Sequence, residues 1–446
     1  MAADNGANRA AVFDDHNPPA RELYKKCVHC GFCLPTCPTY ALWGEEMDSP
    51  RGRIHLMKLA AEGHANLTDS FAQHFDRCLG CMACMTSCPS GVRYDRLIEA
   101  TRAQLQRQYR RSPGEIVHRQ WNFNLFPYPA RLRAALLPAW VYQATGLRAL
   151  ARGTGLLKLL PGKLRATEAL LPAVTLRELF THLPERIPAQ GAVRKRVGML
   201  TGCVQSVLFS GVNAATARVL AAEGCEVIIP REQGCCGALM VHAGLEEQAL
   251  DFARKLIDVF ERANVDTIVI NAAGCGSTMK EYGYLLRQDP KYAERAKAFA
   301  AKCKDISEVL AELEPRAVRH PLHLRVAYHD SCHLQHAQGI RTQPRQMLKT
   351  IPELEILEIP NAALCCGSAG IYNLVQSETA TELGDQKVKN CLSTNPDLVV
   401  SANPGCLVQL ASGLKRAGNG LPVRHMIEVI DAAIQGTPAS ALQARD

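Results

Sequence analysis

The chain has 446 residues, enough for about three domains of ordinary size. Its 47% hydrophobic and 21% charged residues are typical of a soluble globular protein and exclude a disordered or fibrous one. The N-terminal residues lack the apolar run of a signal peptide. The longest charge-free stretch of the apolar middle region, 134–147, contains Pro138 and Gly146 and is too short to span a bilayer. We therefore expect a cytoplasmic protein.

Nineteen cysteines without an export signal are poor material for disulfides, because the cytosol keeps thiols reduced. Eight of them lie in two short strings near the N-terminus, and another eight follow a repeated pattern in the C-terminal half. Only Cys225, Cys303 and Cys391 fall outside these patterns. We expect these three to be small buried apolar side chains.

The two N-terminal strings, CVHCGFCLPTCP at 27–38 and CLGCMACMTSCP at 78–89, share the pattern C-x2-C-x2-C-x3-C-P. In two-cluster ferredoxins the fourth cysteine of such a run ligates the other cluster. Structural zinc favours separated C-x2-C pairs, and His29 is not needed where four thiolates are supplied. We therefore predict two [4Fe–4S] clusters, one held by Cys27, Cys30, Cys33 and Cys88, the other by Cys78, Cys81, Cys84 and Cys37.

The segments around these strings have helical periodicity. Ser49 followed by Pro50 suits a helix start, and apolar residues then recur near helical spacing from Ile54 onward. The segment 94–109 repeats the amphipathic pattern. We predict an α-helical two-cluster ferredoxin domain over residues 20–112. In it, Arg51 and Arg53 either donate to cluster sulfurs or to a partner's carboxylate, or belong to a solvated helix start.

Residues 101–200 are strongly basic, with 17 Lys and Arg against 4 Asp and Glu. We predict a basic, proline-containing helical linker over 113–195. Its charges, leucines and aromatic residues such as Trp140 suit an anionic membrane surface, a partner subunit around which the linker wraps, or a solvated face. No nucleic-acid-binding motif accompanies the charge, so no nucleic-acid partner is expected.

The C-terminal half is an internal repeat in which short β-rich runs lead into cysteine loops and helices. This pattern predicts two tandem α/β cysteine-rich repeats, at 196–320 and 321–435, in an α+β multidomain protein. Such folds place their chemistry at the carboxyl ends of strands. Each repeat brings four cysteines that either bind a further iron–sulfur cluster or are structural: Cys203, Cys235, Cys236 and Cys275 in the first, Cys332, Cys365, Cys366 and Cys406 in the second.

The chain resembles the iron–sulfur subunit of bacterial glycolate oxidase from about residue 22 to 433. The resemblance is carried by CVHCGFC and TCPTY, PRGRI, RCLGCMACMTSCPSGVRY, NAATARVL, GCCGA, GCG and KEYG, LQHAQ, LCCGSAG and VRHMIEVI. The cysteine motifs alone are shared with an iron–sulfur component of glycerol-3-phosphate dehydrogenase, with lactate-utilisation proteins and with heterodisulfide reductases. The longer strings favour glycolate oxidase.

The resemblance implies a complex in which FAD-binding subunits oxidise glycolate to glyoxylate. This chain would carry the electrons toward a membrane quinone, as a cytoplasmic protein peripherally associated with the inner membrane. One departure concerns the heterodisulfide reductases, whose cysteine-rich domains end in C-x-x-C, where Ala272 and Asn403 stand in this chain. Four thiolates per repeat remain, which puts in doubt the unusual clusters of those enzymes.

The sequence contains no G-x-G-x-x-G motif after a strand and no G-x-x-x-x-G-K-[ST] motif. We therefore expect no flavin on this chain, and a non-flavin subunit of an oxidoreductase that is inactive alone, since hydride chemistry needs a flavin or nicotinamide. The alternatives are a thiol or disulfide reductase of the heterodisulfide reductase kind, or the electron-transfer subunit of a D-lactate or glycerol-3-phosphate dehydrogenase.

Overall fold

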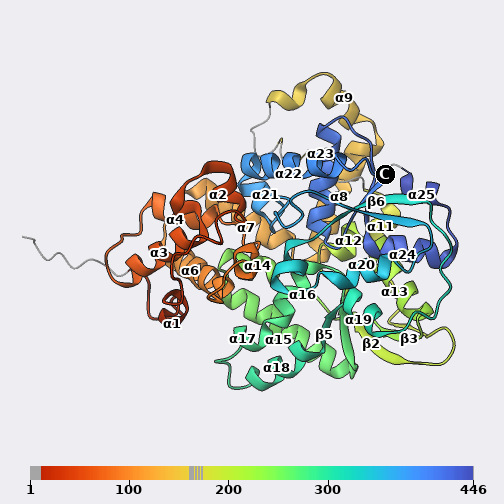
Figure 1. The fold of residues 1–446 in the computed structure, drawn as a ribbon, viewed down its shortest axis with the longest axis horizontal. Helices are drawn as coiled ribbons and strands as arrows, with labels where there is room; N and C mark the ends of the chain where they lie inside the picture. The colour runs from red at the N-terminus through yellow and green to blue at the C-terminus, as the bar shows by residue number, and fades with distance from the viewer. Residues whose placement is uncertain (1–11, 160–164, 166–167, 169–170, 172–173, 445–446) are drawn as a thin grey trace, which may run out of the picture.

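The computed structural model describes residues 12–159, 165, 168, 171 and 174–444, which form a helical lobe and a larger body that contains two sheets (Figure 1). The described part of the lobe, 12–112, is helical and has no strand, as the sequence predicted. Its helices are α1 (Arg21–Tyr24), α2 (Pro38–Trp43), η1 (Glu46–Asp48), α3 (Pro50–Ala61), α4 (Asp69–Asp76), α5 (Ala83–Thr86) and α6 (Tyr94–Gln108).

Helix α3 begins at the predicted position. The Ser49 side chain accepts a hydrogen bond from the Gly52 N–H at 3.0 Å, and Pro50 occupies the first turn, where its fixed φ suits a helix. Met57 of α3 packs with Phe75 of α4 and Leu97 of α6 in one buried cluster. The two cysteine loops lie against this core.

The basic segment folds into helices that pack along the body. These are α7 (Pro113–Leu125), α8 (Pro129–Ala144), α9 (Leu147–Gly153), η2 (Leu156–Leu159) and α11 (Leu176–Phe180). Leu132 and Leu136 of α8 and Leu179 of α11 pack with Val207 of the first repeat, while Phe123 of α7 packs with Met240. Among the described residues, no helix combines the length and the apolar character that a membrane span requires.

The first repeat is built on a five-stranded sheet in the order β1-β3-β2-β4-β5. Its strands are β1 (Arg186–Ile187), β2 (Lys195–Met199), β3 (Cys225–Ile228), β4 (Thr267–Ile270) and β5 (Cys303–Asp305). Strands β2 to β5 are parallel, and β1, which lies in the predicted linker range, adds an antiparallel edge. Its helices are α12 (Gln205–Leu208), α13 (Ser210–Ala222), α14 (Ala238–Ala243), α15 (Glu246–Ala263), α16 (Ala273–Lys280), α17 (Tyr282–Leu285), α18 (Ala293–Lys302) and α19 (Ile306–Glu312).

The second repeat has a parallel four-stranded sheet in the order β7-β6-β8-β9. Its strands are β6 (Leu324–His329), β7 (Leu354–Glu358), β8 (Leu398–Ser401) and β9 (Val423–His425). Strands β4 and β8 are buried along their whole length, as expected for parallel strands inside a sheet. Its helices are η3 (His333–Ala337), α20 (Thr342–Leu348), α21 (Tyr372–Val375), α22 (Ser377–Leu392), α23 (Pro404–Arg416), α24 (Met426–Gln435) and α25 (Ala439–Gln443).

The two repeats correspond strand by strand once β1 is set aside, and they share one core. Helix α13 of the first repeat packs on α24 of the second, and α19 of the first packs on α20 of the second. Apolar side chains from both sheets, such as Val197 and Val326, belong to a single buried cluster. Cys225, Cys303 and Cys391 are buried, which confirms the apolar role predicted for them.

Candidate metal centres

The first cysteine string lies near the surface of the helical lobe. Cys30 is exposed, and Cys27, Cys33 and Cys88 are half-buried. Although Cys88 belongs to the second string, it lines with the other three a cavity of about 30 Å³, which Cys84 also lines. The structure thus brings together the four cysteines that the sequence assigned to one cluster.

The second string is buried, and Cys37 is buried with it. The exposed fractions of Cys78, Cys81, Cys84 and Cys37 are no more than 9%. Burial raises the pKa of Cys84 well above its usual value, and the neighbouring thiols of Cys81, Cys78 and Cys37 raise it further. Cys37 is thus buried like three cysteines of the second string, whereas Cys88 is half-buried like Cys27 and Cys33 of the first.

Two arginines favour a thiolate at Cys78. Burial opposes ionisation of this thiol, but Arg53 and Arg102, with hydrogen bonds from Tyr94 and from the Gly80 N–H, outweigh burial and lower the pKa of Cys78. Arg102 also donates to the carbonyl oxygen of Cys78. Positive charge beside a buried thiol is what an anionic metal–thiolate centre requires.

Arg53 is held in place by a buried polar network. The side chain is 1% exposed and donates to Thr39 Oγ1 at 3.2 Å and to Asp48 Oδ1 at 3.2 Å. Asp48 also pairs with Arg77 at 2.8 Å, so two arginines face one carboxylate. The sequence left open a solvated helix start for Arg53, and the structure shows that this interpretation was wrong.

Arg51, in contrast, lies at the surface beside the first string. Its guanidinium pairs with Glu46 at 2.7 Å and donates to the carbonyl oxygen of His29 at 3.1 Å. Arg51 therefore supports the loop that carries Cys27 and Cys30, and its charge is already paired within the lobe.

The four cysteines of the first repeat meet where three parallel strands end. Cys203 follows β2, Cys235 and Cys236 follow β3, and Cys275 lies in the first turn of α16 after β4. Hydrogen-bonding contacts with Cys203 and Cys236 raise the pKa of Cys235, and contacts with Cys235 and Cys275 lower that of Cys236. The thiols of this set are therefore close neighbours.

The second repeat places its cysteines in the corresponding way. Cys332 follows β6, Cys365 and Cys366 follow β7, and Cys406 lies in the first turn of α23 after β8. The Sγ atoms of Cys332 and Cys365 are 3.9 Å apart, and Cys366 is in hydrogen-bonding contact with Cys365 and Cys406. All four are buried.

Backbone amides support both sets. The Gly237 N–H donates to Cys235 Sγ at 3.4 Å, and the Gly367 N–H donates to Cys365 Sγ at the same distance. An N–H donor stabilises a thiolate and not a thiol. The repeated geometry therefore indicates that each set is arranged for negatively charged sulfur.

Asn403, which stands where heterodisulfide reductases have a cysteine, connects the two sets. Its Nδ2 donates to Cys406 Sγ at 3.5 Å, and its Oδ1 accepts a hydrogen bond from the Gly274 N–H at 3.2 Å. The residue therefore supports the second set from outside and links it to the helix that carries Cys275.

The second repeat also meets the buried string of the lobe. Cys81 lies in one apolar cluster with Cys332 and Cys365. Burial raises the pKa of Cys81 well above its usual value, and the charge of Cys365 raises it further. The buried set of the lobe therefore lies beside the cysteine set of the second repeat.

The donor sets fit iron–sulfur clusters. Each contains four thiols, all nineteen cysteines are free, and the described residues bring no carboxylate into these sets. Cubane clusters are held by four cysteine thiolates, and hydrogen bonds to their sulfurs are usual. Buried Arg53 and the glycine N–H groups supply the positive charge and donors that such anionic clusters need.

Two residues that the sequence did not single out lie against the cysteine sets. Arg102 lies on the polar side of a helix, and nothing in its sequence context indicates that it reaches back to Cys78. His329 ends β6, and a nitrogen of its ring, Cys366 Sγ and Cys406 Sγ all lie within 4.8 Å of one another. Comparison of the two copies, RVGMLTGC and RVAYHDSC, could have drawn attention to this histidine.

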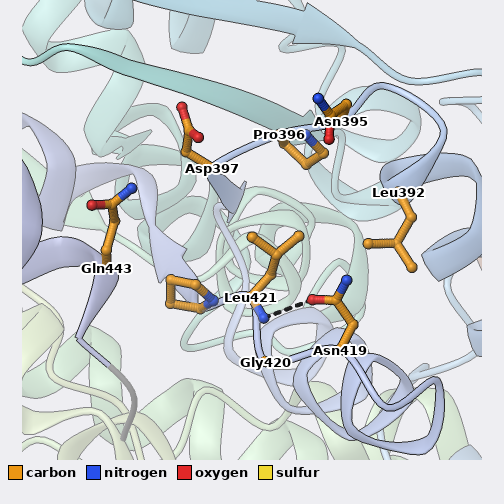
Figure 2. A pocket seen from close by; sticks show the side chains of 9 residues that line it. Leu392, Asn395, Pro396, Asp397, Asn419, Gly420, Leu421 and Gln443 are labelled. Atoms are coloured by element: carbon orange, nitrogen blue, oxygen red, sulfur yellow. Dashed lines mark hydrogen bonds between the residues drawn. The ribbon is translucent and has the colours of Figure 1, made fainter.

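A pocket of about 500 Å³ lies at the end of the second sheet that faces away from the cysteines. Pro396, which precedes β8, and Pro422, which precedes β9, are among its lining residues. Figure 2 shows its lining, including Asn419, which accepts a hydrogen bond from the Leu421 N–H at 2.8 Å. Ligands of open α/β sheets bind at the carboxyl ends of strands. This pocket lies at the amino ends and contains no cysteine, so we do not assign it to the metal centres.

Comparison with known families covers the same regions. The family model described as a 4Fe-4S dicluster domain matches residues 23–92, and the one described as a cysteine-rich domain matches residues 197–280 and 326–411. A third model, the linker region of the glycolate oxidase iron-sulfur subunit, matches residues 115–171. The helical cysteine lobe and the paired cysteine-rich repeats define an iron–sulfur protein.

Two relatives that match nearly the whole chain show to which family of iron–sulfur proteins it belongs. The probable glycolate oxidase iron-sulfur subunit of Bacillus subtilis (strain 168) is 42% identical over 410 residues, which are 91% of this chain and 92% of the relative. The glycolate oxidase iron-sulfur subunit of Escherichia coli (strain K12) is 38% identical over 421 residues, 93% and 95% of the two chains. The chain belongs to the family of glycolate oxidase iron–sulfur subunits.

A more distant relative shares only part of the chain. Lactate utilization protein A of Exiguobacterium sp. (strain ATCC BAA-1283 / AT1b) is 29% identical over 240 residues. Those residues are 54% of this chain and 98% of the relative.

Proposed function

We propose that this chain is the iron–sulfur electron-transfer subunit of a glycolate-oxidising complex. Separate FAD-binding subunits oxidise glycolate to glyoxylate, and this chain passes the electrons toward a membrane quinone. The family membership and the four cysteine sets support this role. The absence of a nucleotide-binding motif from the sequence supports placing the flavin on another chain.

The cysteine sets would hold the cofactors. We assign one [4Fe–4S] cluster to each crossed set of the lobe and one iron–sulfur centre to each repeat. When bound, such clusters supply one-electron carriers. We assign the regions of the chain as a ferredoxin domain at 20–112, a linker at 113–195 and cysteine-rich domains at 196–320 and 321–435.

The observation that carries this proposal is that neighbouring cysteine sets lie next to one another in the fold. The surface set, which contains exposed Cys30, lies beside the buried set, and Cys81 of the buried set packs with Cys365 of the second repeat. Asn403 then joins the second repeat to the first. Three or more closely spaced carriers that begin at a surface are the arrangement that electron transfer between subunits requires.

The surface around the first string suits a docking partner. Val28 is 68% exposed and Phe32 is 66% exposed, and both lie between cysteines of the exposed set. Contiguous apolar side chains at a surface mark interaction sites. We propose that the flavin subunit docks at this loop.

The helices of the linker region suit a membrane surface. Among the described residues, apolar side chains such as Trp121, Leu150 and Leu156 are at least 59% exposed, in the most basic part of the chain. Basic segments with exposed apolar side chains bind anionic bilayers without crossing them. We propose peripheral association with the inner membrane through this surface.

The function can be tested on the complex purified anaerobically through a tag on this chain. Glycolate, D-lactate and glycerol 3-phosphate are added separately, and cluster reduction is followed by visible absorbance and EPR. We expect glycolate to reduce the clusters and iron to exceed the roughly eight atoms of two cubanes. Reduction of the clusters by D-lactate or glycerol 3-phosphate but not by glycolate would contradict the proposal. Purification of this chain without a flavin subunit would contradict it as well.

A matched pair of variants tests the contact between sets. Cys365→Ser should leave the ferredoxin-type clusters reducible by glycolate and abolish electron transfer to a soluble quinone. Cys391→Ser changes another buried cysteine of the same repeat that has no place in a set, and should behave as the parent complex.

A further inference from the structure

His329 occupies an unusual position for a buried histidine. It is the last residue of β6, its side chain is 1% exposed, and neither ring nitrogen makes a hydrogen bond of normal geometry to any described residue. Buried polar groups are almost always paired, so an imidazole with two unpaired nitrogens requires an explanation. A bound group that the protein chain does not itself contain is one such explanation.

The ring lies against the second cysteine set. One ring nitrogen, Cys366 Sγ and Cys406 Sγ are all within 4.8 Å of one another, and all three residues are buried. In a tetrahedral metal site with bonds of about 2.0–2.3 Å, neighbouring ligand atoms are roughly 3.5 Å apart. The three donors therefore surround a common point.

The first repeat has no such group. The strings RVGMLTGC and RVAYHDSC place Leu200 at the position of His329, and Leu200 is equally buried in an apolar cluster. A leucine therefore fits this position of the fold, and packing does not explain the histidine. The second set has five donors, four thiols and one imidazole, where the first has four thiols.

We propose that His329 is a nitrogen ligand of the metal centre in the second repeat, which is therefore a mixed cysteine–histidine centre, whereas the first repeat holds an all-cysteine one. The inference rests on the proposed function, in which the second set binds iron. Replacing anionic thiolate by neutral imidazole raises the reduction potential of an iron–sulfur centre. The second centre is then the easier of the two to reduce, which gives the paired repeats different roles.

The test uses pulsed EPR of the dithionite-reduced full-length chain, purified anaerobically and labelled with ¹⁵N-histidine. We expect a nitrogen coupling of the size of a directly bound imidazole, changed by the label and lost in His329→Leu, which copies the first repeat. His329→Cys should shift the reduction potential of this centre to a more negative value. His333→Leu is the matched control, because His333 Nδ1 lies 3.5 Å from Cys332 Sγ yet Nε2 is bonded to His242.

The outcomes separate this inference from the function on which it rests. A nitrogen coupling that persists in His329→Leu, or one several-fold weaker, of the size of an N–H donor to sulfur, would overturn the ligand assignment. If the double variant Cys366→Ser, Cys406→Ser loses neither iron nor an EPR signal, the second set binds no metal. In that case both the ligand assignment of His329 and the metal centre proposed for the second repeat are wrong. Unchanged ferredoxin-type signals in each variant show that the chain has folded.

Discussion

Gly237 and Gly367 follow the paired cysteines of the two repeats, and both have a left-handed backbone, with φ of 78° and 89°. A Cβ atom on Gly367 would lie 2.6 Å from the carbonyl oxygen of Ala380, and one on Gly237 would lie 3.0 Å from that of Ala249. Only glycine combines this conformation with so close an approach of a second helix, which is α15 in the first repeat and α22 in the second. The chain turns here so that the N–H reaches the cysteine sulfur.

Gly367→Ala should destabilise the protein by about 3 kcal/mol, because it adds left-handed strain to a steric clash. The control is Gly274→Ala, where the Cβ would meet only Asn403 Oδ1 at 3.8 Å, within helix α16. The control should be neutral or slightly stabilising, since alanine favours helices. Urea denaturation of both variants measures the difference, and equal losses would contradict the argument.

The crossed cysteines make a second prediction at this scale. Cys88→Ser and Cys30→Ser should remove the same cluster, and Cys37→Ser should remove the one that Cys84→Ser removes, with a loss of about four iron atoms each. Iron analysis and EPR of the reduced chain are the measurements. Cys303→Ala, a buried cysteine outside every set, is the control and should keep all iron. Identical spectra for Cys88→Ser and Cys84→Ser alone would show that the ligands do not cross.

At the scale of elements, the helices of the linker region expose apolar side chains to solvent. Their inner side chains pack on the body, while Leu150 and Leu156 are about 60% exposed. Arg148 and Arg152, two of the basic residues of this region, both pair with Glu168, at 2.9 and 3.0 Å. These two arginines thus stabilise the region internally, and the exposed leucines are the better test of a membrane role.

Leu150→Glu with Leu156→Glu should reduce binding to phosphatidylglycerol vesicles several-fold. Each leucine that enters the bilayer contributes up to roughly 2 kcal/mol to the free energy of binding, and the new charges repel anionic lipid. Cosedimentation at low and high salt measures the effect. The control is Val193→Glu with Val318→Glu, which changes side chains of 63% and 75% exposure outside these helices. Equal binding of the two double variants would leave these helices as a solvated face.

At the scale of the whole molecule, the lobe is fixed to both repeats. Arg93 pairs with Glu281 of the first repeat at 3.0 Å, and Tyr372 of the second repeat donates to the carbonyl oxygen of Arg77 at 3.0 Å. Glu99 of α6 lies at the same junction, 3.9 Å from His242 of α14. Burial, with the nearby charges of Asp95 and Glu281, raises the pKa of Glu99 to about 8.

The carboxyl group of Glu99 should make the folded protein less stable at alkaline pH. Because the folded pKa of Glu99 lies above the ordinary value of 4.5, its contribution to the free energy of unfolding is complete below about pH 4.5 and is lost as pH rises through 8. Allowing for the 21% of the side chain that is exposed, the loss is about 3 kcal/mol.

Thermal unfolding between pH 6 and 9 tests this expectation. Glu99→Gln should flatten the fall in Tm with pH, whereas Glu62→Gln, an exposed position of the same lobe, should keep it. A fall that Glu99→Gln does not change would assign the pH dependence to other groups.

The sequence by itself determined the local elements and predicted the grouping of the cysteines. Ser49 and Pro50 set the start of α3, and the apolar runs at Val197 and Val326 lie in strands β2 and β6. The spacing of the cysteines predicts which of them belong to each set. These features depend on neighbouring residues, because capping, side-chain periodicity and motif spacing are local. The amphipathic segment 94–109 corresponds to helix α6, Tyr94–Gln108.

Only the tertiary structure decided which distant groups meet. Arg102 reaches Cys78, Cys81 packs on Cys365, and His329 closes on Cys366 and Cys406, although each pair is separated by 24 to 284 residues. The same residue types on another fold would face solvent. Packing of helices and sheets fixes these encounters, and burial together with neighbouring charges and hydrogen bonds then shifts the pKa values of the groups that meet.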